Sequence, residues 1–137
     1  MKQIILITMV CFLAGKSFAQ SVTGITGIRD TAYNLNNEYQ RLQLTYPDIK
    51  MVAVPNPGLV KEKKNIAYCK TAERNLSLDV FYPAKKTKAK KTAILIIHGG
   101  GWRTGNKGMF HAMAQQLAAI GYVCFTPEYR LSTEALY

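Results

Sequence analysis

Hydrophobic and polar positions in the second half of the chain form patterns that predict strands first. Residues 76–82 alternate, with Leu76, Leu78 and Val80 on one face, as in a half-buried strand. Residues 66–69 are also strand-like, and the short polar loop between the two segments suits a hairpin. The sequence therefore predicts an antiparallel pair here.

A second pattern follows this pair. Residues 92–97 are apolar at almost every position, which is typical of a strand covered on both faces in a parallel sheet. A helical pattern over residues 107–120 ends at Gly121 and leads into strand-like residues 122–125. Strand, helix and strand with short joints predict a right-handed crossover. The predicted fold class is α/β, with an antiparallel hairpin, then a parallel strand–helix–strand unit, in an incomplete sheet.

The first nineteen residues have the pattern of a secretory signal. Lys2 precedes an apolar stretch over residues 4–14, and small residues at 17 and 19 predict cleavage after Ala19. The apolar run is too short to span a bilayer, so no stable membrane anchor is expected. We therefore expect export to the periplasm or the extracellular space.

The remaining chain divides in two. Residues 20–65 read as an irregular lead-in, in which Asp30 and Thr31 are candidates to cap a short helix over residues 33–44. Residues 66–137 carry the strand and helix patterns and form the N-terminal portion of the α/β domain.

Charge and cysteines exclude some function classes. The net charge is +10, with lysines clustered at residues 61–64 and 85–91. Nucleic-acid binding is not expected, because no aromatic residues interleave with the second cluster, which suits a solvated turn.

Export permits a disulfide between Cys69 and Cys124, but their apolar surroundings favour two reduced, buried thiols. No Cys-x-x-Cys or paired-His spacing indicates a metal, and no oligomeric state is indicated.

The segment His-Gly-Gly-Gly-Trp-Arg at residues 98–103 holds the candidate chemistry. Glycines at the end of a buried strand let the backbone turn sharply and point its N–H groups outward, where they can stabilise an oxyanion. Nucleotide binding is the weaker interpretation. A phosphate-binding loop would need lysine where Asn106 stands, and a dinucleotide fingerprint would need glycine where Thr104 stands.

Three segments together resemble a known fold. They are Ile-Ile-His-Gly-Gly-Gly-Trp-Arg-Thr-Gly at residues 96–105, Pro-Glu-Tyr-Arg-Leu-Ser at 127–132, and Leu-Ser-Leu-Asp-Val-Phe-Tyr-Pro at 76–83. Residues 66–137 thereby resemble the α/β-hydrolase fold. Within it, they are similar to the esterase and lipase branch related to hormone-sensitive lipase and the secreted carbohydrate esterases.

This resemblance implies roles for the glycine loop. The backbone N–H groups of Gly100 and Gly101 would be oxyanion donors, with Gly99 allowing the turn. Trp102 would either line the acyl pocket or pack the loop. His98 would orient the loop rather than act as the base, because the family's catalytic histidine comes late in the chain.

Four further residues receive supporting roles. The resemblance makes Tyr129 a packing residue near the glycine loop. Glu128 and Arg130 are expected to form a local ion pair, and His111 to be a partly covered helix residue.

A nucleophile is missing from the 137 residues. The near match to Gly-x-Ser-x-Gly, at residues 15–19, is Gly-Lys-Ser-Phe-Ala and falls inside the signal, and Ser132 has no flanking glycines. Acid and base are also absent. We therefore expect an N-terminal fragment in which the most apolar strand lies at an open sheet edge.

The predicted function is that of an exported serine hydrolase that cleaves carboxylic esters through an acyl-enzyme, without a cofactor. The fragment alone is expected to be inactive. Small-molecule and carbohydrate esters are the candidate substrates, and later loops would choose among them. Two alternatives stay open: a serine peptidase of the same fold, and a non-catalytic exported α/β module that binds an anion at the glycine loop.

Overall fold

The computed structural model describes residues 24–135, so the predicted signal peptide lies outside the described residues. Its elements, in chain order, are α1 Leu35–Gln43, the 3-10 turn η1 Pro57–Leu59, β1 Val60–Lys70, β2 Asn75–Pro83, β3 Ala93–Leu95, the 3-10 turn η2 Lys107–Phe110, α2 His111–Ala119 and β4 Val123–Pro127.

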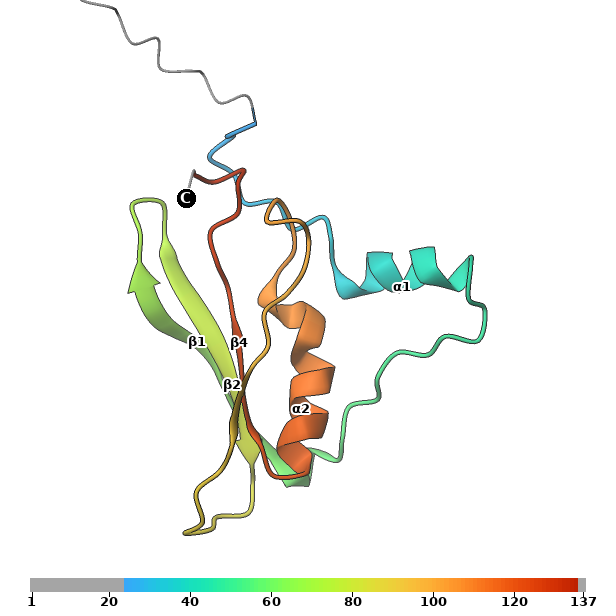
Figure 1. Ribbon diagram of the computed structural model, residues 1–137, viewed down its shortest axis with the longest axis vertical. Helices are drawn as coiled ribbons and strands as arrows, with labels where there is room; N and C mark the ends of the chain where they lie inside the picture. The colour runs from blue at the N-terminus through green and yellow to red at the C-terminus, as the bar shows by residue number, and fades with distance from the viewer. Residues whose placement is uncertain (1–23, 136–137) are drawn as a thin grey trace, which may run out of the picture.

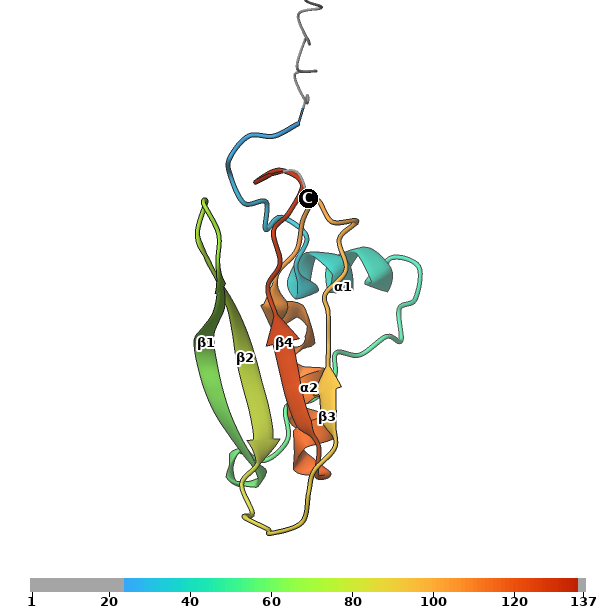
Figure 2. The same cartoon turned by 60° about the vertical axis from the view of Figure 1, so that its left-hand side comes forward.

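The four described strands form one mixed sheet in the order β1-β2-β4-β3 (Figure 2). The β1–β2 and β2–β4 pairs are antiparallel, while β3 and β4 are parallel and are joined through α2. This confirms the predicted fold class, including the hairpin, the parallel strand–helix–strand unit and the place of β3 at the edge of the sheet.

The core lies between α2 and one face of the sheet (Figure 1). Phe81 of β2 and Cys124 of β4 stand opposite each other in register, and both are completely buried. Ala114 and Ala118 face them, one helical turn apart, and their small side chains let the helix lie close to the sheet. Burial of the Phe81 ring alone contributes about 2–3 kcal/mol.

The opposite face of the sheet carries a second apolar row. Val80, Phe125 and Leu95 are neighbours in the register of β2, β4 and β3. Leu95 is 60% exposed and Ile97 59%. The expectation that residues 92–97 are covered on both faces is therefore wrong for the described part of the chain, because β3 is an edge strand there and α2 covers one face only.

The apolar residues that alternate along β2 do not all face the core under α2. Leu78 and Val80 lie on the face opposite α2, whereas Ser77, Asp79 and Phe81 face the helix. A buried polar cluster under α2, described below, is the physical reason.

Two N-terminal boundaries differ from the sequence prediction. β1 begins at Val60, before the expected start at residue 66; its early part is exposed on both faces and has no hydrophobic alternation to mark it. Asn34, not Asp30 or Thr31, caps α1, and its side chain accepts from the Asn37 amide at 3.1 Å. Asp30 instead accepts hydrogen bonds from Thr104 and Gly105, as described below.

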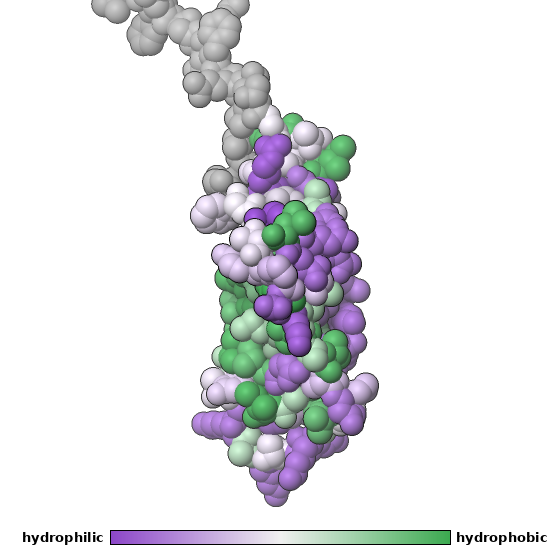
Figure 3. Space-filling model, turned by 90° about the vertical axis from the view of Figure 1, so that its right-hand side faces the viewer, coloured by the Kyte–Doolittle hydropathy of each residue, from purple (hydrophilic) through white to green (hydrophobic). Residues whose placement is uncertain are grey.

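The lysine-rich segment between β2 and β3 is an exposed turn, as predicted. It forms the bottom tip of the molecule in Figure 1, and the same tip is hydrophilic in Figure 3.

Both Cys69 and Cys124 are free thiols, but Cys69 is exposed, because β1 is the other edge strand. The prediction of two buried thiols is therefore wrong for Cys69. Within residues 24–135, no helix has the length and apolar character needed to cross a membrane.

Candidate functional site

The glycine loop, residues 98–105, follows β3 and reverses the chain through left-handed backbone. Gly100 has φ +119°, Gly101 +60° and Trp102 +58°. Gly99 does not have a positive φ, and a Cβ built there meets nothing within 4 Å. The turn therefore requires glycine at 100 and favours it at 101, and the expectation that Gly99 makes the turn is not supported by its backbone.

Two close backbone approaches compact the loop. A Cβ at Gly100 would lie 1.9 Å from the Thr104 carbonyl oxygen, and one at Gly105 would lie 2.7 Å from the Gly99 carbonyl oxygen. Both distances are far below van der Waals contact, so side chains are excluded sterically at these positions as well as by φ.

Carbonyl groups of the loop accept hydrogen bonds, whereas the amides at its start donate none to residues 24–135. The Gly100 carbonyl accepts from the amides of Arg103 at 3.2 Å and Thr104 at 3.1 Å. Among residues 24–135, the Gly99, Gly100 and Gly101 amides donate no hydrogen bond. These donors are neither in the sheet nor in a helix.

A pocket of about 600 Å³ opens beside these amides and is lined by Ile97, His98, Gly99, Gly101, Trp102, Tyr129 and Arg130. The structure thereby brings together most of the residues that the sequence singled out, from two segments about thirty positions apart. Gly100 does not line the pocket, and Glu128 lies behind it. Serine and cysteine are absent from this lining.

His98 and Tyr129 form the floor that holds the loop. The two rings stack with centroids 4.3 Å apart, and the Tyr129 hydroxyl donates to the His98 carbonyl at 2.8 Å. His98 Nδ1 lies 2.8 Å from the Gly99 carbonyl oxygen. Because a carbonyl only accepts, Nδ1 carries the hydrogen. Burial lowers the pKa of His98, which favours this neutral form. These contacts attach His98 and Tyr129 to the loop, and the roles predicted for them stay predictions.

Trp102 is at the rim of the pocket. Its side chain is 66% exposed, and its carbonyl accepts from the Ser132 amide at 2.8 Å. An indole this exposed does not pack the loop, so of the two interpretations the pocket-lining one fits the geometry.

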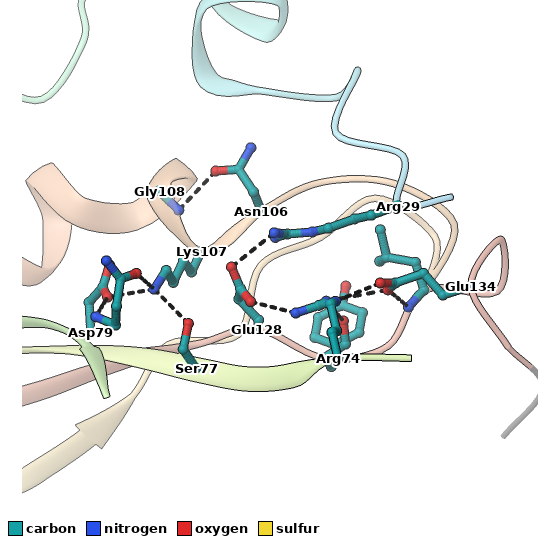
Figure 4. Close-up of polar contacts among 12 residues, drawn as sticks. Arg29, Arg74, Ser77, Asp79, Asn106, Lys107, Gly108, Glu128 and Glu134 are labelled. Carbon is teal, nitrogen blue, oxygen red and sulfur yellow. Dashed lines mark hydrogen bonds and ion pairs between the residues drawn. The ribbon is translucent and has the colours of Figure 1, made fainter. Parts of the chain in front are cut away.

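Glu128 does not pair with Arg130, and this expectation is wrong. Its carboxylate lies between Arg29, at 3.0 Å, and Arg74, at 2.6 Å (Figure 4). Arg130 instead lies 3.9 Å from Glu73. The side chains of residues 128 and 130 diverge because Glu128 is buried while Arg130 faces the pocket.

Arg74 also bonds Glu134, and this contact was not anticipated. Its Nε donates to Glu134 Oε1 at 2.6 Å, and Glu134 Oε2 accepts from the Leu131 amide at 2.8 Å. Burial opposes ionisation of Glu134, but these bonds outweigh it and its pKa is lowered. The network fixes the segment that carries Tyr129 and Arg130. Nothing in the local sequence pointed to Arg74 as the partner of these acids.

A second polar cluster, also missed, lies under α2 and is called here the Asp79 cluster: Asn65, Ser77, Asp79, Lys107 and His111. Lys107 Nζ donates to Asp79 at 2.6 Å, to Asn65 at 2.7 Å and to Ser77 at 3.0 Å (Figure 4). The Asn65 amide donates to Asp79 at 2.7 Å from a backbone with φ +57°. Burial raises the pKa of Asp79, but the Lys107 and Asn65 bonds outweigh it and the net direction is downward.

His111 begins α2 and is partly covered, as predicted. Its Nε2 lies 2.8 Å from Asp79 Oδ2, although the alignment is not that of a hydrogen bond, and its ring contacts Phe81. Burial lowers its pKa, more than the nearby Asp79 charge raises it. Within residues 24–135, no group of three or more His, Cys, Asp or Glu side chains is arranged to hold a metal.

Comparisons with known proteins bear on the fold. A family model, BD-FAE, matches residues 78–137. Among solved structures, Esterase B from Lactobacillus rhamnosis is similar, both alone and in a C6-C4 SN3 inhibited form. It has 28% identity and a TM-score of 0.51, over 70% of this chain and 29% of the esterase. A butyrate-bound thermophilic esterase from Thermogutta terrifontis has 28% identity and a TM-score of 0.48, over 58% of this chain and 27% of that one. No curated protein sequence matches the chain.

This chain spans less than a third of the length of the esterases it matches. The family model covers the glycine loop, α2 and β4. The protein has the fold of the N-terminal part of an esterase-like α/β-hydrolase, and its residues 78–137 match the BD-FAE family.

Proposed function

We propose that this protein is an exported carboxylic-ester hydrolase whose glycine loop stabilises the oxyanion of the tetrahedral intermediate. The Gly101 amide, at the pocket wall, and the Gly100 amide behind it are the donors. A serine nucleophile, an acid and a histidine base from sequence beyond these 137 residues would complete the reaction, with an amide following the serine as a further donor.

One observation supports the proposal above all: amide donors without internal acceptors stand beside a pocket of about 600 Å³. Gly99 and Gly101 are exposed, so their amides can donate to a bound ligand as readily as to water. Donors fixed before the reaction are what oxyanion stabilisation needs.

The pocket wall suggests how an ester would lie. Trp102 and Ile97 offer exposed apolar surface, and Tyr129 and Arg130 lie across from them. We propose that Trp102 contacts the acyl or alcohol group. Whether the bond cleaved is that of an acetylated sugar, a short-chain lipid or another ester depends on parts of the site that these residues do not form.

The test uses the protein expressed from its complete reading frame. It should hydrolyse p-nitrophenyl acetate, and a serine-reactive fluorophosphonate should label it once, at a residue beyond Tyr137. The matched comparison is the Gly101→Val variant, which places a branched side chain at φ +60° in the pocket wall. It should retain fold and labelling stoichiometry but label about 100-fold more slowly.

Absence of labelling in a folded, complete protein would refute the hydrolase. The second candidate, a non-catalytic module, rests on the same free amides and on Arg130 at the pocket. It predicts that sulfate or acetate binds with an affinity that Gly101→Val and Arg130→Ala abolish, in a protein that fluorophosphonate never labels.

A further inference from the structure

We propose that the N-terminal segment, residues 26–33, is a strap that positions the glycine loop, with Asp30 as its principal positioning residue. The inference rests on the proposed function for its kinetic consequence only. The strap lies within the part of the chain that the sequence presented as an irregular lead-in.

Thr104 is the loop residue to which the strap attaches. Its hydroxyl donates to Asp30 Oδ1 at 3.1 Å and accepts from the Tyr33 amide at 3.1 Å. Since a hydroxyl has one hydrogen to donate, its orientation is determined by these two partners. The next residue adds a backbone bond, from the Gly105 amide to the Asp30 carbonyl at 3.2 Å.

Thr104 in turn determines where Gly100 lies. The Thr104 amide donates to the Gly100 carbonyl at 3.1 Å, and its own carbonyl oxygen approaches Gly100 so closely that a Cβ would stand 1.9 Å away. The Tyr33 ring lies 3.4 Å from that same Cβ position. A displacement of Thr104 therefore moves the peptide groups that carry the free amides.

At its other end the strap is attached to the second wall of the pocket. The amides of Thr26 and Gly27 donate to the Thr133 carbonyl at 2.9 and 3.0 Å, and Arg29 pairs with the buried Glu128 (Figure 4). The strap thus joins the glycine loop to the segment that bears Tyr129 and Arg130. Relative placement of the two walls depends on it.

Asp30 is well suited to this role, because one residue serves three contacts. Oδ1 also accepts from the Ala32 amide at 2.9 Å, which turns the strap toward α1. Each of these bonds needs an acceptor at Oδ1 or the backbone carbonyl, and none requires a negative charge. Asparagine should therefore replace Asp30, whereas alanine should not.

The experiment compares Asp30→Ala, Asp30→Asn and Thr104→Val with the parent protein, expressed from the complete reading frame. Asp48→Ala is the matched control, since Asp48 is an exposed acid of the same N-terminal region. Hydrogen exchange of the Arg103, Thr104 and Gly105 amides, which donate hydrogen bonds in the parent, is the first readout, and it needs no enzyme activity. Ester hydrolysis is the second.

Asp30→Ala and Thr104→Val should each raise exchange at the amides of residues 103–105 about fivefold, because each change removes two side-chain hydrogen bonds that hold the strap and the loop. In the ester assay, kcat should fall about tenfold with KM within about twofold, because fixed donors act on the transition state. Asp30→Asn and Asp48→Ala should match the parent in both.

Unchanged exchange in both Asp30→Ala and Thr104→Val would overturn the proposal. So would an Asp30→Asn variant as impaired as alanine, or a rise in KM with kcat unchanged. If Asp30→Ala fails to fold, Thr104→Val alone decides by the same criteria. If the complete protein lacks esterase activity, the proposed function fails, and exchange alone decides whether the strap holds the loop.

Discussion

The glycine loop and the Asp79 cluster use their hydrogen-bonding groups in opposite ways. In the loop, three successive amides, Gly99 to Gly101, have no acceptor within residues 24–135. In the cluster, Asp79 is 1% exposed and receives bonds from Lys107 Nζ and the Asn65 amide. Figure 4 shows Lys107 bonded to Asp79 and Ser77, and Glu128 between Arg29 and Arg74.

This difference separates a candidate site from a structural anchor. The cluster is buried, charged and perturbed in pKa, features that also mark active sites, yet its donors and acceptors are largely spent on one another. The three glycines of the loop carry no charge, but their amide donors remain available beside a pocket. Free amide donors beside a pocket therefore mark the candidate site in this molecule, whereas buried charged groups do not.

The largest effect is expected from Gly100→Ala. Its Cβ would overlap the Thr104 carbonyl oxygen at φ +119°, so the turn must open and displace the free amides. Ester hydrolysis by the complete protein should fall by about 100-fold or more. Gly121→Ala is the matched control, because it has φ +118° but meets nothing within 4 Å. It should cost about 1–3 kcal/mol of stability and leave kcat unchanged. Equal loss of activity in both variants would contradict a specific role for the loop.

Lys107→Met tests the Asp79 cluster. The change leaves a buried carboxylate without its cation, so the free energy of unfolding should fall by about 3–5 kcal/mol in urea titrations. Adding Asp79→Leu to the same protein should recover most of that loss, because the unpaired charge is removed. Glu38→Gln, in the exposed Glu38–Arg41 pair of α1, should leave the unfolding free energy almost unchanged, because solvent screens this pair. If the double variant were no more stable than Lys107→Met, the cluster would not be a self-contained anchor.

Trp102→Gly addresses strain and binding together. Glycine relieves a left-handed backbone at φ +58° and should raise stability by about 1 kcal/mol. It also removes exposed apolar surface from the pocket, so KM for aromatic and short-chain esters should rise about tenfold. Trp102→Ala keeps the strain and loses the ring. It should therefore share the KM change without the gain in stability, which calorimetry and steady-state kinetics would resolve.

The smallest expected effect is the pH dependence of stability, to which both regions contribute a histidine. Burial lowers the pKa of His98 and of His111. The unfolded chain then binds protons more readily, so the unfolding free energy should decline as pH falls below about 6.5. The lowered pKa values of Asp79 and Glu134 add a further decline only below about pH 4. His111→Gln should flatten the first decline in part, and His98→Asn should flatten the rest. A profile unaffected by either would contradict the burial of both rings.

Local patterns in the sequence were enough to predict the hairpin, the crossover and α2. They also identified several of the residues that line the pocket. Alternation, an apolar run and a helical period predicted the hairpin, the crossover and α2, and the resemblance carried by residues 96–105 and 127–132 pointed to two segments that the structure brings together. The strand start at Val60 was missed because an edge strand exposed on both faces needs no hydrophobic period. The Asn34 cap was missed because several Asx and Thr residues nearby were equally suitable.

Local sequence patterns did not predict which side chains pair with each other. The expectation that Glu128 pairs with Arg130 took the nearest opposite charge along the chain, whereas the fold supplies Arg29 and Arg74 from far away. The anchoring of Thr104 by Asp30 crosses more than seventy positions in the same way.

What the sequence determined by itself is the set of short-range choices: where strands and helix form, and where glycine permits the backbone to reverse. These depend on steric and periodic properties of neighbouring residues. Only the tertiary structure decided which donors are spent and which stay free, and which face of β2 is buried. Those outcomes depend on distances between residues far apart in the chain, which exist only after the sheet has assembled.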